Sequence, residues 1–320
     1  FRPITDYGKT MNLQTIVWFE PERVAKDTWL TNTHPEWILG GKDGGLLNLG
    51  NPEARNWLID HVNTLLTKEG IDFYRQDFNM DPLQNWRDND TPDRQGITEI
   101  RHVEGYFTYW DAIRKAHPNM LIDSCASGGR RNDLETLRRA VPLLRSDYIM
   151  EPVGNQCHTH QLALWFPFYG TGTSRTSTYD IRSTLCPSFN ACWDQRDDNI
   201  DWPRLKTIID QWKEFTPYFF GDYYPLTAYS LANDQWIGWQ FNDNAKTGGV
   251  VQIFRRAESI YESAQIPVYG LDPTAKYAVR NVDTPDKVQE FTGEALMQQG
   301  VPVNISERPG TAFITYSKIR

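Results

Sequence analysis

The stretch Ile71-Asp-Phe-Tyr-Arg-Gln-Asp-Phe-Asn79 shows the pattern on which the fold of this chain rests. Its first four residues predict a short β-strand, and charged and polar residues follow that strand directly. The preceding segment, 51–70, predicts a helix with an Asn cap, Pro at its first position and a closing Gly. A helix that leads into a short strand with charged residues at its end is typical of parallel βα units.

The same alternation runs through the first two-thirds of the chain. Because the number of predicted strands is near eight, a (β/α)8 barrel is favoured over an open sheet. From about Pro217 short alternating strands follow one another without helices, which predicts an antiparallel β-sandwich. We therefore expect an α/β fold with a catalytic barrel over 1–216 and a sandwich over 217–320, divided near Thr216. Strands are predicted at 13–19, 46–49, 71–74, 120–122, 143–144, 166–169 and 189–193, and helices at 97–116 and 202–215.

Composition argues against several classes of function and favours a sugar ligand. A length of 320 residues suits a barrel, which commonly takes about 250 residues, together with a compact second domain. The net charge of −8 argues against a nucleic-acid partner, and no apolar run approaches a membrane span. Aromatic residues make up 13 %, including 12 Trp, and such rings commonly stack on sugars. The four cysteines form no C-x-x-C pair, and together with the lack of a leader they favour a cytoplasmic over a secreted protein.

Two carboxylates stand out as candidate catalytic groups. Asp77 and Asp147 each follow a predicted strand directly, with one strand between them, so both are expected on one rim of the barrel. Glycoside cleavage needs one ionised carboxylate and one that holds a proton. Arg75 beside Asp77 is expected to favour its charged form, which suits a nucleophile. The alternatives stay open at this point: the acids as ordinary strand-end residues, and Trp18 as barrel core.

Five ordered blocks of the sequence resemble glycoside hydrolase family 36, the retaining α-galactosidases. They are similar to the family's W-F-E-P-E, H-P-D-W, Y-x-K-W-D-x-N, C-x-S-G-G-G-R-x-D and P-S-D motifs. The blocks are Trp18-Phe-Glu-Pro-Glu22, His34-Pro-Glu-Trp37, Tyr74-Arg-Gln-Asp77-Phe-Asn79, Cys125-Ala-Ser-Gly-Gly129 and Arg145-Ser-Asp147.

The resemblance implies a retaining exo-enzyme that removes terminal α-linked galactosyl residues from oligosaccharides or glycosides. It implies Asp77 as the nucleophile, Asp147 as the general acid/base, a covalent glycosyl-enzyme intermediate, and no metal or organic cofactor. Trp18 would form a wall of the sugar subsite, and Arg75 would contact the sugar hydroxyls. The remaining lining residues implied in this way are Asn79, Cys125, Ser127 and Gly128.

The sequence also departs from the family pattern. Gln76 replaces a Trp, Arg75 replaces a Lys, Arg130 replaces a Gly, and a sugar-binding Arg has no counterpart near Gly44-Gly45. A pocket without that Trp and Arg could admit a larger 2-substituent, so α-N-acetylgalactosaminidase activity is an alternative. Transglycosylation and, in another class, a non-catalytic galactose-binding protein are further alternatives. The presence of both Asp77 and Asp147 argues against the last.

The resemblance further implies that the barrel is incomplete. The family has an N-terminal β-domain and a first strand with an Asp-Asp pair, whereas this chain begins in the segment before the second strand. The segment 13–19 would then be strand two, and at most seven strands are present. We expect an upstream segment, a partner chain or a substituted element to complete the barrel, because an open parallel sheet leaves apolar edges. A homo-oligomer also stays open.

Overall fold

The computed structural model describes residues 1–149, 151–166, 168–243, 245 and 247–319. The chain divides into two compact units, 1–147 and 148–320, each described by itself below. The predicted domain boundary near Thr216 lies inside the second unit, between a helix and a 3-10 turn. The two units are defined by the density of their internal contacts, which does not distinguish a barrel from a sandwich. The boundary between barrel and sandwich near Thr216 therefore stays a prediction.

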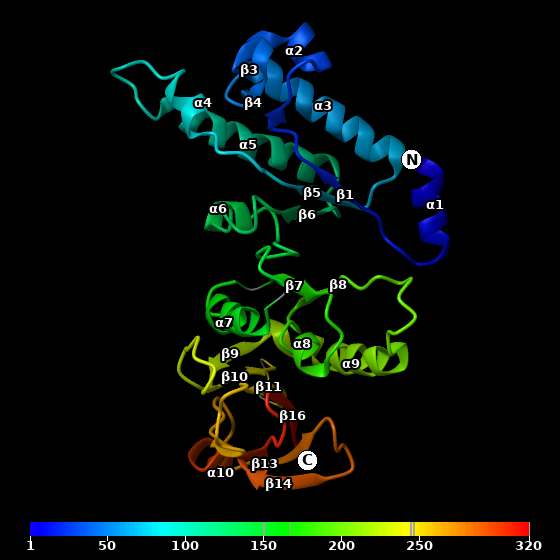
Figure 1. The fold of residues 1–320 in the computed structure, drawn as a ribbon, viewed down its shortest axis with the longest axis vertical. Helices are drawn as coiled ribbons and strands as arrows, with labels where there is room; N and C mark the ends of the chain where they lie inside the picture. Colours follow the sequence, from blue (N-terminus) through cyan, green and yellow to red (C-terminus); the bar gives the residue numbers. More distant parts are fainter. Residues whose placement is uncertain (150, 167, 244, 246, 320) are drawn as a thin grey trace. The chain divides into compact units, whose positions relative to one another are not determined.

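The first unit is built on a three-stranded parallel sheet in the order β1-β5-β6. The long helix α3 joins β1 to β5, and α5 joins β5 to β6, as parallel βα units require. Figure 1 shows these two helices running together beside the strands. The Asn51 side chain caps α3 by accepting from the backbone of Glu53, and Gly70 ends it with a φ of 65°. The bounds are β1 (Ile16–Phe19), α3 (Pro52–Glu69), β5 (Phe73–Gln76), α5 (Ile97–Ala116) and β6 (Leu121–Ser124).

The two faces of this sheet carry different side chains. One row of register partners, Val17, Tyr74 and Ile122, packs into the apolar core beneath α3 and α5. The next row along the strands holds Trp18, Arg75 and Asp123, which lie on the opposite face because successive strand residues alternate. The sheet therefore turns one face to its helices and the other to the candidate site.

Two predicted strands of the first unit have a different structure. Residues 45–47 form β4, which pairs antiparallel with two short strands and does not join the parallel sheet. Leu143 and Leu144 form no strand, because the amide of Leu143 donates to the Asp123 side chain at 2.8 Å instead of to a backbone carbonyl. Only Val141 makes a parallel bridge to Asp123. The smaller elements are α1 (Arg2–Thr10), β2 (Arg23–Val24), α2 (Trp29–Thr33), η1 (Pro35–Trp37), β3 (Ile38–Leu39), η2 (Gly41–Asp43), β4 (Gly45–Leu47), α4 (Leu83–Arg87) and α6 (Leu134–Leu137).

The second unit begins with parallel βα structure and ends in antiparallel strands. The strands β7 (Gly170–Thr173) and β8 (Ser188–Ala191) pair in parallel. They lie among α7 (Pro152–Leu162), α8 (Thr178–Arg182), α9 (Trp202–Phe215) and η3 (Thr216–Phe220).

A six-stranded antiparallel sheet follows, in the order β14-β13-β16-β11-β10-β9. One face packs against helical segments through residues such as Trp239 and Phe254, and the other packs against the pair β12-β15 through Val251 and Ile253. Two layers with apolar side chains between them make up the antiparallel sandwich predicted from the alternating sequence. The bounds are β9 (Asp222–Pro225), β10 (Trp236–Asn242), β11 (Gly248–Arg255), β12 (Ser263–Ile266), β13 (Lys276–Asn281), β14 (Val288–Thr292), α10 (Gly293–Gln298), β15 (Val301–Asn304) and β16 (Gly310–Lys318).

Two further features concern the edge of the parallel sheet and the helices. Within the described residues, β1 is hydrogen-bonded as a strand only to β5, so its other edge is open. Among the helices of that same part of the chain, we find none with the length and apolar character to cross a membrane.

Candidate active site

Asp77 is the first residue after β5, and its surroundings hold it in a single position. Its backbone N–H donates to the carbonyl of Phe19 at 2.8 Å, which extends the pairing of β5 with β1. Its Oδ1 accepts from the amides of Phe78 at 2.7 Å and Ser127 at 3.2 Å, while Oδ2 accepts from Trp18 Nε1 at 3.2 Å. Only 8 % of the residue is exposed, so these bonds replace most of its hydration.

The same hydrogen bonds decide the charge of Asp77. Burial alone raises the pKa of this carboxyl, but hydrogen bonds from Asn79, Phe78, Ser127 and Trp18 outweigh it and leave the pKa below its usual value. Arg75, the expected source of this effect, instead forms its ion pair with Asp123. The expectation of an ionised Asp77 therefore holds, with hydrogen bonds as its main cause.

The turn after β6 brings the two candidate acids to neighbouring positions. Ser127 has a φ of 46°, which points its N–H at Asp77, and its hydroxyl donates to Asn79 Oδ1 at 3.0 Å. Gly128 follows with a φ of 96°, and a Cβ placed there would lie 3.3 Å from the backbone N of Asp147 and 3.8 Å from its Oδ2. Asp77 is thus bound to one residue of this turn, and Asp147 lies against the next.

Asp147 and Trp18 differ from Asp77 in exposure. Asp147 is exposed to solvent, as a group that exchanges protons with a leaving oxygen and water requires. Trp18 is 53 % exposed among the described residues and lies on the sheet face opposite the apolar core. Its indole N–H is bound to Asp77 while part of its ring remains open, which suits stacking against a sugar.

Cys125 lies beside the same carboxylate. Its amide donates to the carbonyl of Gln76 at 2.8 Å, and the residue is 4 % exposed. Burial raises the pKa of the thiol to about 11, so it is protonated at neutral pH and can line a pocket without adding charge. The structure therefore gathers Trp18, Asn79, Cys125, Ser127 and Gly128 around Asp77 and Asp147.

A buried ionic cluster behind this site was not predicted. Glu22 is fully buried and accepts two hydrogen bonds from Arg131, at 2.6 and 2.7 Å. It also contacts His102 Nε2 at 2.8 Å and accepts from Gln76 Nε2 at 2.8 Å. Burial opposes the charge of Glu22, but Arg131 and His102 hold its pKa well below the usual range. The signal for this cluster was that Glu22 ends one of the quoted blocks and Arg131 lies two residues after another.

Gln76 links this cluster to the nucleophile candidate. Its side-chain oxygen accepts from the Tyr74 hydroxyl and from Trp110 Nε1, both at 2.7 Å. The side chain is fully buried and bound at both ends. Gln76, the residue directly before Asp77, is therefore hydrogen-bonded both to Glu22 and to Trp110 of α5.

In the part of the chain that the structure describes, we find no cluster of side chains that could bind a metal ion. There, no three His, Cys, Asp or Glu side chains gather as a metal site would require.

Comparison with known sequences gives matches along both units. Residues 2–161 match the family model described as Melibiase, and residues 236–314 match the Glycosyl hydrolase family 36 C-terminal domain. Alpha-galactosidase 1 of Pediococcus pentosaceus is 23 % identical over 326 residues, and Alpha-galactosidase Mel36A of Lactobacillus acidophilus is 24 % identical over 319 residues. Each alignment covers 92 % of this chain and 42 % of the relative.

Solved structures share the fold over the whole chain. The alpha-galactosidase from Lactobacillus brevis matches with a TM-score of 0.86 at 19 % identity, covering 100 % of this chain and 46 % of that one. A variant of the family 36 alpha-galactosidase AgaA from Geobacillus stearothermophilus, solved in complex with raffinose, matches with a TM-score of 0.85 at 19 % identity, covering 99 % and 46 %.

These matches confirm the predicted fold class, and the chain spans less than half the length of these relatives. The Melibiase family model covers half of the chain, and the family 36 C-terminal domain follows it in the expected order. This chain belongs to glycoside hydrolase family 36.

Proposed function

We propose that the protein is a retaining α-galactosidase that removes terminal α-linked galactosyl residues. The observation that carries this proposal is the turn at Ser127 and Gly128, with Asp77 bound to its first residue and Asp147 against its second. One carboxylate is buried and held ionised, while the other is exposed to solvent. That difference matches the two roles in retaining glycoside cleavage.

In the proposed reaction, Asp77 attacks the anomeric carbon and forms a glycosyl ester. The bond to the leaving oxygen breaks, and Asp147 donates a proton to that oxygen. A water then enters, Asp147 accepts its proton, and the water oxygen displaces Asp77 from the anomeric carbon. Two displacements restore the α configuration. The lowered pKa of Asp77 favours the ionised nucleophile that the first step needs.

The substrate class is supported by the relatives and by the exposed ring of Trp18. The curated relatives are named alpha-galactosidases, and one solved relative holds raffinose. Trp18 offers a half-open aromatic face beside Asp77, and Arg75 lies next to it in register. We assign the sugar hydroxyls to Arg75 and the apolar face of the sugar ring to Trp18.

The alternative of N-acetylgalactosamine specificity loses part of its basis. It assumed that Gln76, in place of a Trp, leaves more room in the pocket. The Gln76 side chain is instead buried in the cluster with Glu22, Tyr74 and Trp110, so the exchange adds no room beside Asp77. We therefore place the galactosyl substrate first.

The test compares 4-nitrophenyl α-galactoside with its α-N-acetylgalactosaminide analogue on the wild-type protein and on Asp77→Asn. We expect faster cleavage of the galactoside and a loss of kcat on the order of 10⁴-fold in the variant. Proton NMR of the first product should show the α anomer. A β anomer would refute the mechanism, and a wild-type protein that binds galactose without turnover would support the galactose-binding alternative.

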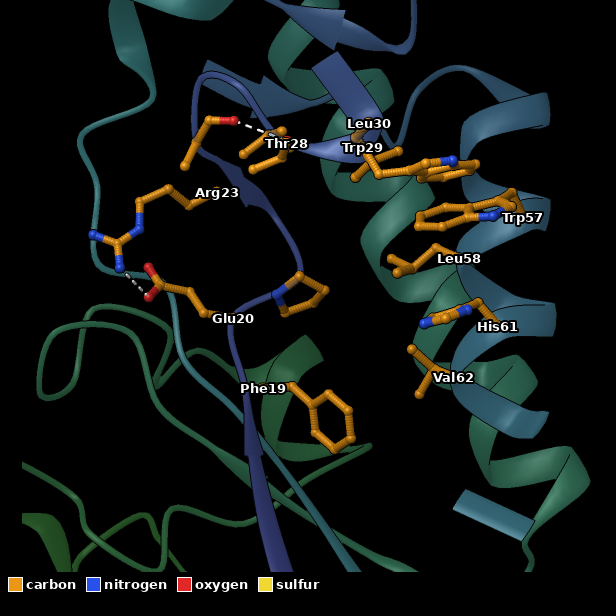
Figure 2. Close-up of a pocket in the computed structure, with 13 residues that line it drawn as sticks. Phe19, Glu20, Arg23, Thr28, Trp29, Leu30, Trp57, Leu58, His61 and Val62 are labelled. Atoms are coloured by element: carbon orange, nitrogen blue, oxygen red, sulfur yellow. Dashed lines mark hydrogen bonds and ion pairs between the residues drawn. The ribbon is translucent and has the colours of Figure 1, made fainter. Parts of the chain in front are cut away.

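We further propose that a segment outside these 320 residues pairs with the open edge of β1. A groove of about 560 Å³ begins at Phe19, the last residue of β1, and lies between the segment that follows it and α3. Figure 2 shows Trp57, Leu58, His61 and Val62 of α3 facing the segment that carries Phe19. Parallel sheets are normally covered on both faces and at their edges, and relatives are more than twice as long as this chain.

Hydrogen exchange can test this completion of the sheet. The amides of β1 should exchange much more slowly in the protein as its gene encodes it than in a fragment of these 320 residues. Those of β6 serve as the control, because this strand is already bordered by β5 and Val141. Equal exchange of β1 in both samples would refute the proposal.

A further inference from the structure

Asp123 is a buried acid on the same sheet face as the candidate site. It is 1 % exposed and lies on β6 in register with Arg75 of β5, which in turn lies in register with Trp18 of β1. In a parallel sheet such register partners point to the same side. The row thus leads from the exposed ring of Trp18, through a guanidinium, to an enclosed carboxylate.

The two oxygens of Asp123 bind two different segments. Oδ2 accepts from Nη1 of Arg75, and Oδ1 accepts from the amide of Leu143 at 2.8 Å. The segment around Leu143 is further attached by the parallel bridge between Val141 and Asp123, and it leads directly to Asp147. One carboxylate therefore contacts both the cation near Asp77 and the segment that ends in Asp147.

The ion pair with Asp123 leaves part of the Arg75 guanidinium accessible to a ligand. Its side chain is 18 % exposed, whereas that of Asp123 is 2 % exposed, so the guanidinium lies between the interior and solvent. A guanidinium is a planar fork with five N–H donors, and one of its nitrogens binds Asp123. Fixing that nitrogen also fixes the plane of the fork and the direction of its other donors.

We propose that Asp123 is a positioning residue for sugar binding, which acts by orienting the Arg75 guanidinium. The inference rests on the proposed galactosidase function and deepens it, because it names what aims the sugar-binding cation. Arg75 binds the hydroxyls of the galactosyl group with the donors that Asp123 leaves free. Because hydrogen-bond geometry is steep, a guanidinium released from Asp123 binds the same sugar with much lower affinity.

The variant Asp123→Asn isolates this contact. The Asn oxygen can still accept from Leu143, so the segment leading to Asp147 keeps its attachment, while the charge that holds Arg75 is lost. In the protein as its gene encodes it, we expect KM for 4-nitrophenyl α-galactoside and the inhibition constant of galactose to rise about ten- to a hundred-fold. The change in kcat should be smaller.

Asp72→Asn is the matched control. Asp72 also accepts from a backbone amide, that of Thr15 at 2.8 Å, and pairs with a cation, Lys9 at 3.6 Å. It lies just before β5, at the opposite end of that strand from Asp77, so the same chemical change is made away from the site. Its KM and kcat should equal those of the wild type.

A double-mutant cycle with Arg75→Ala separates positioning from a general structural role. If Asp123 acts through Arg75, Asp123→Asn has no further effect on KM when Arg75 is already Ala. An equal rise of KM in both backgrounds would overturn the inference, as would a wild-type KM in Asp123→Asn. In both cases the proposed function stands if the wild type hydrolyses the galactoside. A wild type that neither cleaves nor binds galactosides overturns both.

Discussion

Two acid–arginine pairs in the first unit differ in the number of contacts that join them. Glu22 and Arg131 form a two-point contact, with Glu22 fully buried and Arg131 between the rings of Phe78 and Tyr106. Asp123 and Arg75 share one contact, and the two arginine side chains are similarly exposed, 15 % for Arg131 and 18 % for Arg75. Both terminal nitrogens of Arg131 bind Glu22, whereas one terminal nitrogen of Arg75 binds Asp123.

The comparison shows how similar residues serve different purposes. The pair of Glu22 and Arg131 connects the segment after β1 to the turn after β6, and through Gln76 it reaches the end of β5. Trp18, Ser127 and Asp77 lie in or next to these three segments. We conclude that this two-point pair holds the site together, while the one-point pair of Asp123 and Arg75 contacts what enters it.

The largest expected effect is on stability. Arg131→Met should lower the free energy of unfolding by about 3–5 kcal/mol, because it leaves Glu22 buried without its main counter-charge. Arg75→Met should lower it by less, about 1.5–3 kcal/mol, because one contact is lost instead of two and Asp123, whose pKa is already raised, can take up a proton; yet the variant should abolish tight galactose binding. Urea unfolding and galactose inhibition measure the two effects. Equal losses of stability would contradict the division of roles.

The next effect concerns the turn between the two acids. Gly128→Ala places a Cβ 3.3 Å from the backbone of Asp147 at a φ of 96°, which costs about 1–3 kcal/mol of strain. We expect kcat to fall about a hundred-fold through displacement of Asp147. Gly96→Ala is the control, since that glycine also has a positive φ, of 91°, but a Cβ there meets no atom within 4 Å. Equal kcat in the two variants would argue against the role of this turn.

The smallest effect is a difference in pH dependence. The pKa of Glu22 is lowered in the fold, so its contribution is present above the unfolded value of about 4.3 and is lost on acidification. The pKa of Asp123 is raised, since burial outweighs Arg75 and the amide of Leu143, so its charge disfavours folding as pH rises. The stability difference between wild type and Glu22→Gln should shrink from pH 6 to pH 3. That for Asp123→Asn should change in the opposite direction.

Local sequence signals predicted much of this fold. The helix at 52–69 follows an Asn cap and ends before Gly70, the helix at 97–116 ends before His117-Pro118, and the strands around Asp77 alternate or are β-branched. The position of Asp77 directly after a strand follows from the same short-range pattern. The residues around both acids were named through the family resemblance, which depends on short blocks of neighbouring residues.

Contacts between distant residues were decided only by the tertiary structure. The partner of Arg75 lies 48 positions away, and that of Glu22 lies 109 positions away, so no local spacing reveals either pair. The segment at 143–144 has strand-forming residues, yet the buried Asp123 side chain takes the amide that a strand would use. Propensity acts over a few residues, whereas a buried charge must find its partner wherever the fold brings one.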